Sequence, residues 1–168
     1  MKSFRTLNFS FIDFTEMDEN LSREVWKCRN MTEIRKFMTD SNPICYESHN
    51  YFVKSLDSQD KVCYYCVLMN EQFIGSVNIH FINSQTVERG IYIHPMFWGK
   101  GLSKLISSEF YSYLYFHKGI KTIVTKVMKN NKASNSLQYS LGGKLLKEDD
   151  IYYYYELKLG PDLLRVYE

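Results

Sequence analysis

The sequence predicts an α+β fold in which a mixed, mostly antiparallel central sheet is flanked by helices. Three strand-like runs follow one another closely and are joined by short turns such as Asn70-Glu71-Gln72, so they are expected to form an antiparallel meander. These runs cover Val62–Met69, Phe73–Asn83 and Thr86–His94. Apolar residues then recur with helical spacing over Leu102–His117, which predicts a long helix. Strands followed by alternating helices and strands are typical of the α+β class.

The remaining elements lie on either side of this centre. Before it, the expected elements are a strand over Arg5–Phe14, a helix over Glu19–Cys28 capped by Asp18, a short helix over Met31–Met38 and a helix capped by Ser48. After it, they are a strand over Ile120–Met128, a helix over Lys132–Leu141 that ends at Gly142-Gly143, and strands over Lys144–Glu148 and Ile151–Leu159. Because no repeat or linker-like segment interrupts the chain, residues 1–159 are expected to form one domain and residues 160–168 a C-terminal tail.

Composition limits the classes of function. The chain has 168 residues, 45% of them hydrophobic and 24% charged, and its net charge of +2 is too small to predict binding to nucleic acid. No apolar run approaches the roughly 18 residues of a membrane span, and no signal peptide is recognised, so we expect a cytoplasmic protein that binds no membrane. Its cysteines are then expected to be reduced. Cys63 and Cys66 fall on opposite faces of a predicted strand, so no metal site is predicted.

The most informative segment is the turn Trp98-Gly-Lys-Gly-Leu-Ser-Lys104 between a predicted strand and the long helix. Free amide donors and the positive end of a helix dipole meet at such a turn, and together they bind phosphate groups. Gly99 and Gly101 have no Cβ atom, so a pyrophosphate can approach the backbone, while Lys100 and Lys104 add positive charge. The alternative is an ordinary glycine-rich helix cap. The spacing fits neither a Walker A loop nor a dinucleotide fingerprint.

At this turn the chain resembles the GNAT family of N-acetyltransferases. The signature of that family is Gln/Arg-x-x-Gly-x-Gly/Ala after a strand, and this sequence has Trp98-Gly-Lys-Gly-Leu-Ser103, in which the central glycine matches. A second signature is similar to Asn131-Lys-Ala-Ser134 followed by Leu141-Gly142. The resemblance extends over nearly the whole chain and implies one acetyltransferase domain over residues 1–159.

The resemblance implies acetyl-CoA as cosubstrate, bound in a split between central strands, without a metal. The pantetheine arm would pair with the backbone of one strand, the pyrophosphate would lie on the amides of the glycine turn, and two polar residues would line the other side. The residues implied are Ile91, Tyr92, Ile93, Trp98, Gly99, Lys100, Gly101, Leu102, Ser103, Lys104, Asn131 and Ser134.

Candidate catalytic residues follow from the chemistry of amine acetylation. The departing thiolate benefits from a proton donor, which in this family is often a tyrosine of the last helix. Tyr139 is one candidate, but counting from Leu141-Gly142 places the family position on Gln138, about 100° away around the helix. Glu88 and His80 are candidate bases for the amine, although each has an alternative as an ordinary strand residue.

A narrower resemblance concerns the acceptor. The chain looks like the members of this family that act in bacterial pseudaminic acid synthesis for flagellin glycosylation and acetylate the 4-amino group of a UDP-linked 4-amino-4,6-dideoxy sugar. The resemblance rests on segments that include Phe11–Thr15, Arg29-Asn30, Gly90–Tyr92 and Val127–Asn131. It implies a nucleotide site formed by Arg29, His49 and Tyr92. Two neighbouring polar positions of that group fall on His80 and Phe81, so these acceptor contacts differ here, and Asn78 is a further candidate because it shares a strand face with His80.

Two alternatives remain open from the sequence. One is acetylation of a peptide or ribosomal-protein N-terminus, although such an acceptor favours an acidic groove and the candidate wall is basic and aromatic. The other is an acyl-CoA-binding module without turnover, which the missing Gln/Arg of the first signature and the displaced tyrosine permit. Oligomeric state is not indicated by any sequence feature.

Overall fold

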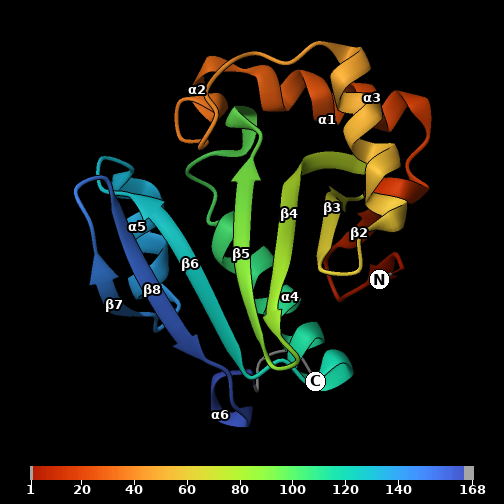
Figure 1. Ribbon diagram of the computed structural model, residues 1–168. Coiled ribbons are helices and arrows are strands. Elements are labelled where there is room, and N and C mark those ends of the chain that lie inside the picture. Colours follow the sequence, from red (N-terminus) through yellow and green to blue (C-terminus); the bar gives the residue numbers. More distant parts are fainter. Residues whose placement is uncertain (1, 165–168) are drawn as a thin grey trace. The chain divides into compact units, whose positions relative to one another are not determined.

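A computed structural model describes residues 2–164 of the chain (Figure 1). Its eight strands follow the order β1-β2-β3-β4-β5-β6-β8-β7; β1 with β2, β2 with β3, β6 with β8 and β7 with β8 pair antiparallel, whereas β5 pairs with β6 in parallel. The predicted α+β class with a mostly antiparallel sheet is therefore confirmed. The chain divides into two compact units, one up to Asn78 together with Ile91–Lys100, the other comprising Ile79–Gly90 and the chain from Gly101 onward.

The first unit holds the N-terminal strands and helices. Its elements are β1 (Phe4–Arg5), β2 (Ser10–Asp13), α1 (Glu19–Asn30), α2 (Thr32–Arg35), α3 (Tyr46–Ser55), β3 (Val62–Met69), most of β4 (Gln72–Asn83) and the end of β5 (Thr86–Ile93), with 3₁₀ turns over Phe14–Glu16, Leu56–Ser58 and Pro95–Phe97. The β3–β4 turn has positive φ at Asn70 (50°) and Glu71 (65°), the geometry of a tight hairpin turn, as its sequence predicts. Apolar side chains from the helices and strands form a cluster that includes Phe14, Val25 and Cys66.

The second unit holds the long helix and the C-terminal part of the sheet. Its complete elements are α4 (Leu102–Lys118), β6 (Thr122–Met128), α5 (Lys132–Ser140), β7 (Lys144–Glu148), β8 (Tyr152–Lys158) and α6 (Pro161–Leu164). The parallel pairing of β5 with β6 joins Thr86–Glu88 to Thr122–Val124, and β6, β8 and β7 continue as an antiparallel sheet.

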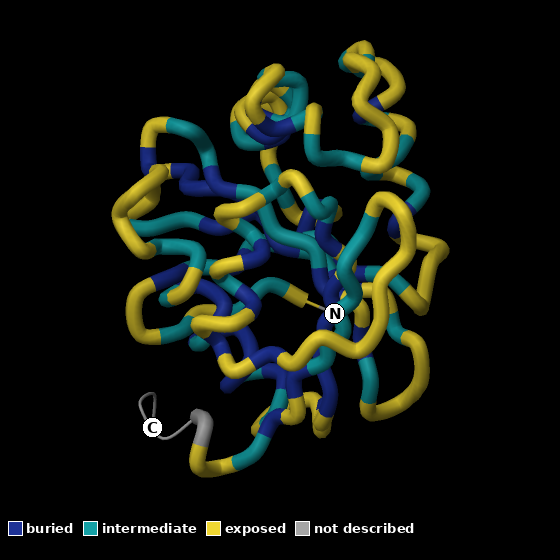
Figure 2. Tube along the Cα trace, turned by 90° about the vertical axis from the view of Figure 1, so that its left-hand side faces the viewer, coloured by how far each residue is buried: buried dark blue, intermediate teal, exposed yellow. Residues whose placement is uncertain are grey.

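Burial follows the pleat of this sheet. On β6, Ile123, Thr125 and Val127 are buried, whereas Lys126 between them is exposed. Figure 2 shows the burial of each residue along the Cα trace, with exposed residues in the outlying turns. The two faces of β6 therefore have different chemistry, which decides where functional side chains can lie.

The structure corrects three local predictions. The strand predicted over Arg5–Phe14 is two short antiparallel strands, β1 and β2, joined by a turn in which the Thr6 amide donates to the Phe9 carbonyl. The helix predicted over Met31–Met38 forms only α2, and α3 is capped by the Cys45 sulfur, which accepts from the Ser48 amide, so Ser48 is not the cap. The predicted tail contains α6, and residues 165–168 lie outside the described part of the chain.

Candidate functional site

The end of β5 leads into a turn that is held by its own side chains. The Trp98 indole Nε1 donates to the Ile93 carbonyl (2.8 Å), and the His94 Nδ1 accepts from the Met96 amide (3.2 Å). The Trp98 amide donates to the Pro95 carbonyl (3.1 Å), and Gly99 has a φ of 75°. This left-handed conformation requires glycine, which explains the first glycine of the sequence motif.

The N-terminus of α4 has the chemistry of an anion site. Gly101 precedes the helix with a φ of 73°, and a Cβ added to it would meet no atom within 4 Å, so a ligand can approach its backbone. Within residues 2–164 no side chain caps this helix end, and the Gly101 carbonyl accepts from the amides of Lys104 and Leu105. The first amides of α4 thus point, with the positive end of the helix dipole, toward the position that a phosphate group would take.

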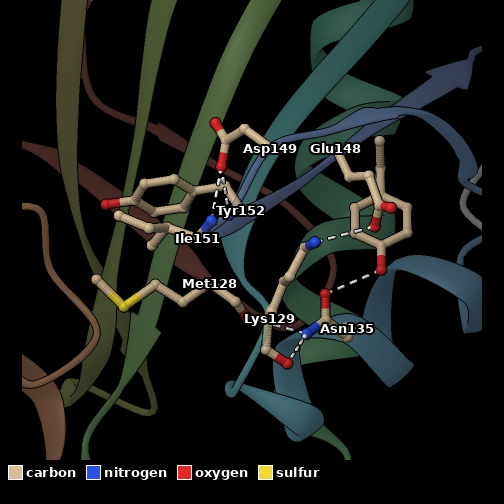
Figure 3. A network of polar contacts seen from close by, with 8 residues as sticks. Met128, Lys129, Asn135, Glu148, Asp149, Ile151 and Tyr152 are labelled. Carbon is tan, nitrogen blue, oxygen red and sulfur yellow. Dashed lines mark hydrogen bonds and ion pairs between the residues drawn. The ribbon is translucent and has the colours of Figure 1, made fainter.

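The start of α5 is fixed by two asparagines. The Asn131 Oδ1 caps the helix by accepting from the Ser134 amide (3.1 Å). The Asn135 Nδ2 donates to the carbonyls of Met128 (3.0 Å) and Asn131 (2.9 Å), while its Oδ1 accepts from the Tyr155 hydroxyl (2.9 Å). Figure 3 shows Asn135 with dashed lines to its hydrogen-bond partners. Asn135 and Tyr155 thus hold Asn131 and Ser134 in place. The sequence did not indicate a role for Asn135 or Tyr155, because the hydrogen bond between these two side chains joins residues 20 positions apart.

Gln138 and Tyr139 point in different directions from α5. The Gln138 side chain is 4% exposed, its Oε1 accepts from the Thr125 hydroxyl on β6 (2.9 Å), and its Nε2 donates to the Ser134 carbonyl (3.2 Å). Tyr139 is 60% exposed, and its ring contacts the edge of the Tyr155 ring at 5.3 Å between centroids. Of the two candidates for assisting the departing thiolate, Gln138 therefore lies between α5 and the sheet.

Glu88 and His80, the candidate bases, are both exposed in the structure, on β5 and β4. The neighbour of Glu88, Arg89, points to the opposite face of β5, where it is 4% exposed and donates to the Tyr111 hydroxyl of α4. The guanidinium of this buried arginine thus donates to hydroxyl groups of α4, those of Tyr111 and Ser107. The contact with α4 settles which face of β5 is covered by helices, and Glu88 lies on the other face.

The residues that the sequence assigns to the nucleotide have partners of their own. Arg29 donates to the carbonyls of Asp40 (2.8 Å) and Asn42 (3.3 Å). His49 is 3% exposed and is hydrogen-bonded through Nε2 to the Ser22 hydroxyl (3.1 Å), and burial lowers its pKa.

Tyr92 packs against the apolar cluster of the first unit, and burial raises the pKa of its hydroxyl. Asn78 and Phe81 on β4 are half-buried.

A groove of about 550 Å³ opens on the second unit, along the side of α5 that carries Tyr139. Its walls are Lys129, Lys132, Asn135, Ser136, Tyr139, Leu145, Glu148, Tyr153 and Tyr155. Lys129 forms an ion pair with Glu148 (3.2 Å) across one wall, as Figure 3 shows. Of the residues predicted for catalysis or binding, only Tyr139 lines this groove.

Among residues 2–164, no three or more His, Cys, Asp or Glu side chains are grouped to hold a metal ion. No helix in the same range has both the length and the apolar character needed to cross a membrane.

Comparison with known proteins identifies the family. The family model described as "Acetyltransferase (GNAT) domain" matches residues 11–144. A curated relative, "Acetyltransferase PseH" of Campylobacter jejuni subsp. jejuni serotype O:23/36 (strain 81-176), is 27% identical over 146 residues, which are 87% of this chain and 91% of the relative.

Two solved structures have the same fold. The crystal structure of Campylobacter jejuni N-acetyltransferase PseH in complex with acetyl coenzyme A superposes with a TM-score of 0.75 at 24% identity, over 90% of this chain and 99% of that one. A GNAT-family acetyltransferase from Bacillus anthracis gives a TM-score of 0.79 at 13% identity, over 93% and 98% of the two chains. The predicted GNAT-like fold is confirmed, as is acetyl-CoA as the cosubstrate. The chain therefore belongs to the GNAT acetyltransferase family and is an N-acetyltransferase that uses acetyl-CoA.

Proposed function

We propose that this enzyme acetylates the 4-amino group of a UDP-linked 4-amino-4,6-dideoxy sugar in the cytoplasm, in pseudaminic acid synthesis for flagellin glycosylation. The observation that carries the proposal is the match to the PseH acetyltransferase of Campylobacter jejuni, which extends over 91% of that protein. The sequence segments that resemble the pseudaminic acid group, among them Phe11–Thr15 and Gly90–Tyr92, lie within the residues 11–144 that the GNAT family model matches.

The proposed coenzyme site uses the turn after β5 and the start of α4. The amides at the N-terminus of α4 and the ammonium groups of Lys100 and Lys104 bind the pyrophosphate. The backbone of Ile91–Ile93 binds the pantetheine arm as an added strand, and Asn131 and Ser134 line its other side. The fit is supported by the positive φ of Gly101 and by the uncapped first turn of α4 among the described residues. The Trp98 amide, which is bonded to Pro95, contributes to the turn and not to the ligand.

The proposed reaction is direct attack in a ternary complex. Glu88, directly or through a water molecule, accepts a proton from the sugar ammonium, with His80 as the second candidate. The amine then attacks the acetyl carbon, so that an N–C bond forms while the C–S bond breaks. The nitrogen loses its remaining extra proton and coenzyme A leaves as the thiol. A hydrogen bond from the Gln138 side-chain amide to the departing sulfur supports this last step. Gln138 is favoured over the exposed Tyr139 as this donor, because its side chain is buried and held by Thr125.

The test is incubation with acetyl-CoA and the UDP-4-amino sugar, followed by mass spectrometry of the sugar and quantification of free coenzyme A. We expect one acetyl group per sugar and an equal amount of coenzyme A. The same sugar already acetylated at the 4-amino group is the control. Acetylation of peptides but not of the sugar would establish a peptide acetyltransferase, and tight coenzyme binding without turnover on any amine would establish a binding module.

A further inference from the structure

The backbone groups at the end of β5 point alternately to the two sides of the strand. On the side of β4, the His94 amide donates to the Ile74 carbonyl (2.8 Å). The Tyr92 carbonyl lies on the same side, because a Cβ added to Gly75 of β4 would meet its oxygen. Successive residues of a strand direct their amide and carbonyl to opposite sides, so those of Ile93 point away from β4.

This second side of β5 is the one along which the proposed pantetheine arm lies. Among residues 2–164, the register of β5 with β6 includes Thr86–Glu88 and does not extend to Ile91 or Ile93. Ile91 directs its amide and carbonyl to the same side as Ile93, because the two residues are separated by one position. The amide groups of the pantetheine arm can pair with such an edge in the manner of an added strand.

The Trp98 side chain engages one group of this edge. Its indole Nε1 donates to the Ile93 carbonyl (2.8 Å). The Ile93 carbonyl therefore has a donor from within the chain, at the point where a longer ladder with the ligand would continue. The strand-like pairing is thus limited to the groups that precede it, which are the Ile91 backbone and the Ile93 amide.

The indole ring is held in place and still has an open face. Trp98 is 48% exposed although its N–H is bonded, whereas the neighbouring Phe97 is 8% exposed and contacts the His94 ring at 6.1 Å between centroids. A ring that is fixed through its N–H offers a preorganised apolar surface. Trp98 also stands at the position where the family signature has Gln or Arg, so this surface distinguishes the chain from the signature.

Trp98 connects the two parts of the proposed coenzyme site. Its side chain reaches back to Ile93 on the strand edge, and Gly99, the next residue, begins the glycine turn with a φ of 75°. Because the Trp98 amide donates to the Pro95 carbonyl (3.1 Å), the proposed pyrophosphate donors begin after Trp98. In coenzyme A, the pantoate carbon that carries the methyl groups lies between the pyrophosphate and the first amide of the arm.

We infer that the Trp98 side chain is a coenzyme-binding residue, an inference that rests on the proposed location of the coenzyme. Its N–H ends the pairing of the pantetheine arm at Ile93, and its exposed ring contacts the methyl groups of the pantoate. An apolar ring suits this position, because the methyl groups are removed from water when they contact it. The indole thereby sets the point at which the ligand leaves the strand edge and enters the glycine turn.

The first experiment measures ligand binding to the whole enzyme by isothermal titration calorimetry. In Trp98→Ala we expect acetyl-CoA to bind about tenfold more weakly, since the contact with the methyl groups is lost. The affinity for 3′-phospho-ADP, the part of coenzyme A without the pantetheine arm, is expected to stay within about twofold of the wild-type value. A purely structural role of Trp98 in the turn would instead weaken both ligands alike. Thermal unfolding of each variant shows that the fold is intact.

The second experiment uses tryptophan fluorescence, because the chain has only two tryptophans. The other one, Trp26, is a matched control, since its indole Nε1 also donates to a backbone carbonyl, that of Ile44 (2.8 Å). In Trp26→Phe, where Trp98 is the emitting residue, saturating acetyl-CoA is expected to shift the emission to shorter wavelength as the ring loses water. In Trp98→Phe no shift is expected, and Trp26→Phe should bind acetyl-CoA with wild-type affinity.

The outcomes separate this inference from the proposed function. Unchanged emission of Trp26→Phe at saturating acetyl-CoA, or equal losses for acetyl-CoA and 3′-phospho-ADP in Trp98→Ala, overturns the contact with Trp98. Lys100→Glu tests the proposed pyrophosphate site separately: weaker binding of 3′-phospho-ADP supports that site, and wild-type affinity overturns it. No acceptor is present in these measurements, so a failure to acetylate the UDP-4-amino sugar overturns the proposed acceptor and not the role of Trp98.

Discussion

The Thr125 hydroxyl donates a 2.9 Å hydrogen bond to the Oε1 of Gln138, and this contact fixes the amide between β6 and α5. The Gln138 side-chain amide therefore has one orientation, in which Oε1 is the acceptor and Nε2 donates to the Ser134 carbonyl. The residue next to it, Tyr139, projects from the exposed side of the helix.

Gln138→Ala is therefore expected to lower kcat more than KM, by roughly tenfold, because a hydrogen bond to the departing sulfur is made only as the C–S bond breaks. Tyr139→Phe is the matched control and should leave kcat within about twofold of the wild-type value. Steady-state kinetics at saturating acetyl-CoA measure both. A large loss of kcat in Tyr139→Phe with none in Gln138→Ala would reverse the assignment.

Glu88→Gln is expected to reduce kcat by about 100-fold or more at pH 7, since a positioned base contributes this much to proton transfer. His80→Asn should reduce it far less if His80 is not the base. Measuring kcat/KM between pH 6 and 9 adds a second readout. At high pH more of the acceptor amine is already neutral and needs no base, so the activity of Glu88→Gln should be partly restored. A variant that loses no activity at any pH would remove Glu88 from the mechanism.

Tyr155→Phe is expected to destabilise the protein by about 1–3 kcal/mol, because the Asn135 Oδ1 loses its buried donor. Asn135→Ala should cost at least as much, since carbonyls at the end of β6 and the start of α5 lose a donor as well. Urea unfolding followed by circular dichroism gives the free energies of unfolding. Tyr153→Phe, on the neighbouring half-buried position of β8, is the control and should change stability little. Equal effects of the two phenylalanine variants would contradict the role of the Asn135 contact.

His49 predicts a dependence of stability on pH. Burial is the main cause that lowers its pKa from the ordinary value of 6.5, so the folded protein keeps the ring neutral at a pH where the unfolded chain protonates it. The stability that this group contributes is complete above pH 6.5 and is lost as the pH falls through the lowered pKa of the folded state. The free energy of unfolding should therefore decrease between pH 7 and 5, and less steeply in His49→Gln. Identical slopes in the wild type and the variant would show that His49 does not cause the decrease.

Gly75→Ala is expected to be severely destabilising. An added Cβ on β4 would lie 2.2 Å from the Tyr92 carbonyl oxygen and 2.9 Å from the Ile93 Cα on β5, so backbone atoms would have to move. Overpacking costs about 1–3 kcal/mol and occasionally more, and the upper end applies here because backbone atoms have to move. Gly160→Ala, where a Cβ meets nothing within 4 Å, is the control. Differential scanning calorimetry measures both variants, and a wild-type melting temperature for Gly75→Ala would show that β4 and β5 are not this close.

The sequence by itself determined the features that depend on neighbouring residues. The strand meander, the hairpin turn at Asn70-Glu71, the glycine turn before α4 and the offset of Tyr139 from the family position all follow from local conformation or short spacing. The family resemblance follows from the same local segments. One prediction from local sequence was wrong: a single strand was expected where β1 and β2 form, because the turn between them contains no glycine or proline that would indicate it.

Only the tertiary structure decided which distant side chains meet. Asn135 reaches Tyr155, and Lys126, Tyr154 and Lys147 share one row, because β6, β8 and β7 pair in a particular register that no short segment encodes. The engagement of Arg29 with the Asp40 carbonyl likewise depends on where the following loop returns. Register is set by the burial of one whole face of the sheet, a property of all its strands together, and a one-residue slip would turn Lys126 into the core.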